Sequence, residues 1–122
     1  MKNFGKKTWM IADGYYDSTF NKQVSHDAVC VLNTSDSDAT ITMTLYFEDR
    51  EPVGDFVAAC NAGRTHHIRM DKLKNKDGIS VPKDVPYAIL VESNVNVVVQ
   101  YSRLDTAQAE LALMTTIAYP ID

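Results

Sequence analysis

The sequence contains few cysteines and no long hydrophobic run. Cys30 and Cys60 are the only two cysteines among 122 residues, and they form no C-x-x-C motif. We therefore expect two reduced thiols and a cytoplasmic protein. The lysines near the N-terminus are not followed by the apolar stretch of a signal peptide, and no segment approaches the roughly 20 apolar residues of a membrane helix.

The sequence also lacks an excess of positive charge. Its 12 Lys and Arg residues are outnumbered by 16 Asp and Glu residues, which gives a formal net charge of −4 at pH 7. Non-specific nucleic-acid binding depends on Lys and Arg side chains that neutralise phosphates, so this balance disfavours a DNA-binding role. Lys72, Lys74 and Lys76 form a local basic cluster, for which we expect a solvated, charged loop.

Catalytic and metal-binding patterns are missing as well. The chain has no G-x-S-x-G motif and no phosphate-binding G-x-x-x-x-G-K-[ST] motif. His26 and Cys30 would lie roughly 13 Å apart along an extended strand, too far for proton transfer. His66 and His67 are adjacent and point to opposite faces of a strand, so without a bulge they cannot both bind one ion with His26 as a third ligand. We expect no enzyme activity, no cofactor and no metal.

Alternation of apolar and polar residues dominates what is present. In residues 39–47, Ile41, Met43, Leu45 and Phe47 share one face while threonines and a tyrosine share the other. With 45% hydrophobic and 23% charged residues, the chain fits one globular domain over residues 1–122. We expect an all-β fold, an antiparallel β-sandwich. Its strands are expected at residues 7–12, 24–32, 39–47, 53–60, 64–70, 87–93, 95–103 and 115–119.

The connections between these strands are predicted from turn residues. Residues 33–38 are rich in Asn, Ser and Asp, so the strands on either side should form an antiparallel hairpin. Ser93 and Asn94 should form the turn between the two late strands, and residues 71–86 should form a surface loop. One short C-terminal helix is expected over residues 105–113, with Asp105 as its N-cap.

Polar side chains gather near the end of the late strand and on one face of residues 64–70. Such donors and acceptors suit hydroxyls, carboxylates or phosphates, and the aromatic residues could stack on a sugar ring. Two alternatives stay open: Arg103 and Asp105 as a structural pair that fixes the corner between strand and helix, and Trp9 as a core residue. The candidate ligand-binding residues are Trp9, Tyr15, His26, His67, Arg69, Gln100, Arg103 and Asp105.

Several motifs in order along the chain resemble the sensory rhodopsin transducer family. They lie in residues 5–15, 25–33, 51–54, 93–95, 98–105, 108–110 and 116–119. The resemblance implies a small cytoplasmic β-sandwich that assembles as a homotetramer and binds the cytoplasmic side of a sensory rhodopsin. It also implies a wider superfamily for which small-molecule binding, including sugar binding, has been proposed. His66 departs from the family pattern, as does the segment from Cys60 to Gly63.

Two functions follow from these patterns, and a third is weaker. The first is a non-enzymatic sensor that binds a small polar ligand, such as a sugar or sugar acid, near His67, Arg69, Gln100 and Arg103. The second is a signal transducer that docks on a membrane photoreceptor, and the third is a DNA-binding regulator. The polar face of residues 39–47 and the open edge strands of a sandwich also favour a homo-oligomer.

Overall fold

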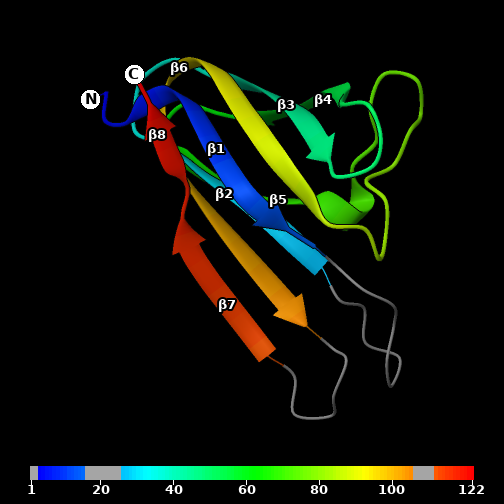
Figure 1. Ribbon diagram of the computed structural model, residues 1–122. Helices are drawn as coiled ribbons and strands as arrows, with labels where there is room; N and C mark the ends of the chain where they lie inside the picture. The colour runs from blue at the N-terminus through cyan, green and yellow to red at the C-terminus, as the bar shows by residue number, and fades with distance from the viewer. Residues whose placement is uncertain (1–2, 16–25, 106–111) are drawn as a thin grey trace.

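The structure, a computed structural model, describes residues 3–15, 26–105 and 112–122. Every strand pairing in these residues is antiparallel, as expected for a β-sandwich (Figure 1). The only helical element described is a 3₁₀ turn, η1, at Met70–Lys72. The strands are β1 (Lys6–Gly14), β2 (His26–Asn33), β3 (Ala39–Phe47), β4 (Val53–Cys60), β5 (Arg64–Arg69), β6 (Tyr87–Asp105), β7 (Ala112–Ile117) and β8 (Tyr119–Ile121).

One strand belongs to both layers of the sandwich. The first layer has the order β4-β3-β6-β1-β8, and the second contains β5, β2, β6 and β7. The first half of β6 pairs with β1 and β3, whereas its second half pairs with β2 and β7. Figure 1 shows the first half of β6, in yellow, beside β1, and its second half, in orange, beside β7.

The sequence prediction of two late strands joined at Ser93 and Asn94 is therefore wrong. Ser93 pairs with Ile41 of β3, and the strand continues without a turn. The Asn94 side chain instead accepts a hydrogen bond from the Thr40 amide at 2.7 Å and donates to the Asp38 carbonyl at 3.4 Å. The Asn94 side chain thus fixes the start of β3 at Asp38 and Thr40, and the chain does not reverse at this point.

The expected hairpin of the second and third strands is also wrong. β2 pairs with β5 and β6, while β3 pairs with β4 and β6, so residues 34–38 cross between the layers. Buried Asn33 holds this crossing, because its side-chain amide donates to the Ser37 carbonyl at 2.8 Å and to the Cys60 carbonyl at 3.0 Å. Turn chemistry predicted that the chain turns here, but not which strand it meets next.

The short C-terminal helix is not found in the described residues. Asp105 ends β6, Ala112 begins β7, and the two residues are paired across the β6–β7 ladder. Residues 106–111 of the expected helix lie outside the described residues. Six register pairs join these two strands, so strand pairing overrides the helix propensity at both ends of the segment.

The core lies between the layers and follows the alternation of the sequence. Ile41, Met43 and Leu45 of β3 are fully buried, and β3 and β4 have the bounds that their sequence predicts. The predicted loop over residues 71–86 is confirmed apart from the 3₁₀ turn and two isolated bridges, although its Val81 is buried in the core. No helix in the described part of the chain is long and apolar enough to cross a membrane.

Candidate functional site

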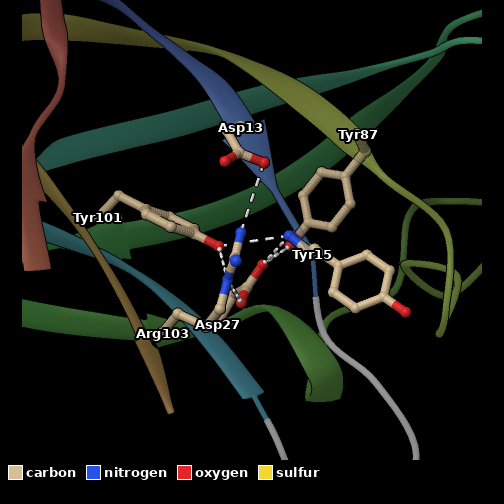
Figure 2. Close-up of polar contacts among 6 residues, drawn as sticks. All are labelled: Asp13, Tyr15, Asp27, Tyr87, Tyr101 and Arg103. Atoms are coloured by element: carbon tan, nitrogen blue, oxygen red, sulfur yellow. Dashed lines mark hydrogen bonds and ion pairs between the residues drawn. The ribbon is translucent and has the colours of Figure 1, made fainter. Parts of the chain in front are cut away.

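A buried carboxylate lies where β1, β2 and β6 come together. Asp27 of β2 is fully buried, and it shares a strand face with Val29 and Val31. The register pairs Asp27 with Arg103 and Val29 with Tyr101, so both β6 side chains face the same interior as Asp27. Figure 2 shows the group that we call the Asp27 cluster: Asp13, Tyr15, Asp27, Tyr87, Tyr101 and Arg103.

One oxygen of Asp27 is well hydrogen-bonded. The Tyr87 hydroxyl donates to Asp27 Oδ2 at 2.5 Å, and the Tyr15 backbone N–H donates to the same oxygen at 2.8 Å. The Tyr101 hydroxyl accepts from the Tyr15 N–H at 3.3 Å and from Arg103 Nε at 3.1 Å. These contacts tie the end of β1 to both halves of β6 through one carboxylate.

The Arg103 guanidinium lies between two carboxylates without a short contact to either. Its Nε is 3.6 Å from Asp27 Oδ1, and its Nη2 is 3.5 Å from Asp13 Oδ1. Asp27 Oδ1 and Arg103 Nη2 are both buried and have no hydrogen-bond partner among the described residues. The guanidinium also lies over the rings of Tyr15 and Tyr101, at 5.9 and 5.7 Å from their centroids.

Burial controls the protonation of the cluster. It raises the pKa of Asp27 above its ordinary value, although hydrogen bonds from Tyr87, Tyr101 and the Tyr15 N–H oppose the rise. Burial also raises the pKa of Tyr101, and the neighbouring Asp27 carboxylate raises it further. Tyr101 therefore stays a protonated phenol near neutral pH, which suits hydrogen bonding and not nucleophilic attack.

The raised pKa of Asp27 predicts a pH dependence of stability. Between its ordinary value of 3.8 and its folded value, Asp27 holds a proton in the folded chain and has lost it in the unfolded chain. Folding then takes up a proton, so the Asp27 contribution to the free energy of unfolding falls as the pH rises through this window. Urea unfolding of the wild type and of Asp27→Asn at several pH values isolates this contribution, because the other carboxylates titrate in both proteins. A wild-type advantage that grows with pH would contradict the prediction.

Gly14 makes room for the Tyr87 ring. A Cβ atom at Gly14 would lie 2.7 Å from the nearest ring carbon of Tyr87, closer than real contacts allow. We expect Gly14→Ala to displace the ring from Asp27 and to lower the free energy of unfolding by about 1–3 kcal/mol. Gly54→Ala is the matched control, since its Cβ would meet the Thr44 hydroxyl at an ordinary 3.5 Å. Urea unfolding of both variants measures the difference, and equal stabilities would refute the steric argument.

The structure brings only some of the predicted ligand-binding residues together. Tyr15 and Arg103 belong to the Asp27 cluster. Trp9 is a core residue with 5% exposure, and its ring N–H donates to the carbonyls of Lys6 and Val97 at 3.0 and 3.1 Å. His26 begins β2 opposite Leu104.

Three other predicted residues, His67, Arg69 and Gln100, lie on the outer face of the second layer, opposite to the face that carries Asp27. His67 and Gln100 both pair with Cys30, from opposite sides of β2, and both are exposed. Arg69 forms two hydrogen bonds of 2.8 Å with Asp71 on its own chain segment. Asp105 ends β6, and the ion-pair partners described for Arg103 are Asp13 and Asp27.

Sequence reasoning missed Asp27, Tyr87 and the role of Asp13. A signal for Asp27 was available, because its position alternates with Val29 and Val31 and so predicts an inward-facing carboxylate. Nothing local marks Tyr87 as its partner 60 residues away. Among the described residues, no group of three or more His, Cys, Asp or Glu side chains could hold a metal ion.

Comparisons with known proteins agree on one family. The model of the family described as Anabaena sensory rhodopsin transducer matches residues 4–120. A crystal structure of Thermotoga maritima protein 1070 is 39% identical, with a TM-score of 0.84 and coverage of 96% of each chain. The structure of the Anabaena sensory rhodopsin transducer is 40% identical, with a TM-score of 0.77, and the match covers 89% of this chain and 96% of that one. No match was found among curated proteins.

Proposed function

Because this chain belongs to the Anabaena sensory rhodopsin transducer family, we propose that it is a non-enzymatic signal transducer that docks on a membrane photoreceptor from the cytoplasm. The observation that carries the proposal is the similarity over residues 4–120, which includes nearly the whole sandwich. The name of the solved relative supports a sensory rhodopsin as the receptor. Neither that name nor the scattered placement of the predicted residues points to a sugar or sugar acid.

An apolar stripe on the outer face of the first layer supports docking. Met10 of β1 pairs with Tyr119 of β8 on one side and with Leu90 of β6 on the other. Met10 is 46% exposed and Tyr119 is 70% exposed, and Tyr46 of β3, which pairs with Ala88 of β6, is 43% exposed on the same face. Exposed apolar side chains on neighbouring strands are typical of protein interaction sites.

Binding to a rhodopsin in lipid nanodiscs tests the proposal. We expect the wild type to bind saturably, and Met10→Glu to bind at least about tenfold more weakly, because it places a charge in the apolar stripe. Ile79→Glu is the matched control, since Ile79 is 48% exposed but lies in the loop before β6. Absence of wild-type binding, together with failure to cross-link any integral protein in the source membranes, would contradict the proposal.

We also propose that the working form is a homotetramer. β7 is an edge strand that pairs with β6 alone in the described part of the chain, and its sequence contains no charged residue. Leu113 and Ile117 on this edge are 76% and 57% exposed, and such edges readily pair with other chains. Light scattering after size-exclusion chromatography should give four times the mass of one chain, whereas a monomer mass would refute the assembly.

A further inference from the structure

A groove opens at the edge of the sandwich between β1 and β7. β8 pairs with β1 only at Thr8–Met10, and β7 pairs with β6, so no described ladder joins β7 to the end of β1. The groove has a volume of about 380 Å³. Ile11 and Asp13 of β1 line one side, Met114 and Thr116 of β7 line the other, and Tyr101 of β6 contributes to the lining between them.

The polar part of this groove belongs to the Asp27 cluster. Asp13 and Tyr101 line the groove, and Arg103 Nη2 lies 3.5 Å from Asp13 Oδ1. Nη2 is buried without an acceptor in the described part of the chain, so it can still donate a hydrogen bond. Nη2 is covered and Arg103 is not among the groove-lining residues described, so a hydroxyl group reaches it only where the Asp13 side chain turns aside. There the hydroxyl would accept from Nη2 and donate to Asp13. The Asp13 side chain, 83% exposed, is free to turn and admit it.

The charges around Arg103 and Asp13 favour an uncharged ligand group at this position. Arg103 supplies one positive charge, whereas Asp13 and Asp27 supply two negative charges. A carboxylate or phosphate would meet net repulsion, and an ammonium group would lie against the Arg103 guanidinium. A hydroxyl is uncharged and is both a donor and an acceptor, so it satisfies both partners.

The residues that line the groove favour a ligand that is mostly apolar. Apart from Asp13, Tyr101 and Thr116, the described residues that line the groove are apolar or aromatic, among them Ile11 and Met114. A sugar has a hydroxyl on most of its carbons, and several of these would be left without partners against such walls. A small ring or short alkyl chain with one hydroxyl fits both the walls and the volume.

We propose that this groove binds a small neutral alcohol or phenol, with its apolar body between β1 and β7. Its hydroxyl accepts from Arg103 Nη2 and donates to Asp13. The groove shares Met10 and Tyr119 with the apolar stripe of the first layer, whereas Asp13, Tyr101, Met114 and Thr116 lie outside that stripe. Variants at Asp13 and Met114 therefore test the groove separately from receptor docking.

Titration with benzyl alcohol, followed by amide chemical shifts in solution NMR, tests this site. We expect saturable shifts at Ala12, Asp13, Met114 and Thr116, with a dissociation constant on the order of 1 mM for a ligand of this size. Benzoate and benzylamine carry the same ring with a charge, and both should bind at least about tenfold more weakly. Glucose should give no saturable shift at the same residues.

Two variants identify the contacts. Met114→Trp fills the groove from a residue that is 45% exposed and should abolish binding, whereas Val57→Trp, at a 54% exposed position outside the groove lining, should bind as the wild type does. Asp13→Ala removes one hydrogen-bond acceptor and should weaken binding by about 2- to 10-fold. Asp13 is largely exposed, so this variant tests the site even if Met114→Trp does not fold.

Several results would overturn the proposal. They are the absence of saturable shifts, shifts confined to residues outside the groove, and benzoate binding as tightly as benzyl alcohol. Unchanged affinity in the folded Met114→Trp and Asp13→Ala variants would also overturn it. If the wild type binds rhodopsin but does not bind benzyl alcohol, the groove proposal is refuted and the docking proposal is unaffected.

Discussion

Replacement of Asp27 by alanine is expected to lower the free energy of unfolding by about 3–5 kcal/mol. The variant leaves the Arg103 guanidinium, which is only 22% exposed, without its buried countercharge. It also removes the acceptor of the Tyr87 hydroxyl and of the Tyr15 N–H. Each buried donor left unpaired adds a desolvation cost. Urea unfolding monitored by circular dichroism measures the change.

Asp13→Ala is the matched control for this prediction. Asp13 contacts the same guanidinium at a similar distance, but its side chain is 83% exposed. Exposed ion pairs contribute little, so we expect a loss below about 1 kcal/mol. Equal losses in the two variants would show that burial is not what makes the Asp27 carboxylate important.

Trp9→Ala should destabilise the fold by a similar amount, about 3–5 kcal/mol, because it removes a large core side chain and leaves a cavity. The indole N–H also donates to two carbonyls, those of Lys6 and Val97, which are paired residues of β1 and β6. Tyr119→Ala truncates an aromatic side chain that is 70% exposed and should change the stability by less than about 0.5 kcal/mol.

This pair of variants also separates two roles for Trp9. If Trp9 were a ligand-stacking residue, its alanine variant would fold with nearly wild-type stability and lose only binding. Thermal and urea unfolding of Trp9→Ala in the absence of any ligand therefore distinguishes a core residue from a binding residue. A loss below about 1 kcal/mol would contradict the core assignment.

The parts of the fold that depend on local alternation could be predicted from the sequence. β3 alternates between buried and more exposed residues along most of its length, so both its bounds and its buried face follow from the pattern. Pairing partners could not be predicted in the same way. Ser93 and Asn94 have the composition of a turn, yet they continue a strand because partners on β1, β2, β3 and β7 fix β6 on both sides.

The candidate site was also only partly predictable, because its residues come together through long-range strand pairing. Arg103 and Tyr15 could be chosen as polar and aromatic residues near strand ends, and the structure brings them together. Asp27 could have been inferred from its inward position, but its partners Tyr87 and Tyr101 are 60 and 74 residues away along the chain. Only the three-dimensional register places these hydroxyls beside the carboxylate.

The double membership of β6 has a consequence for synthesis and folding. In the described residues β1 pairs only with β6 and β8, so the first strand to be made has no partner until residues from 87 onward have left the ribosome. β3 and β4 can form a hairpin earlier, but neither layer can be completed before β6 is available. Late, long-range pairing of this kind slows folding and leaves apolar strands exposed in the meantime. A nascent chain stalled before β6 should therefore be the species that chaperones recognise.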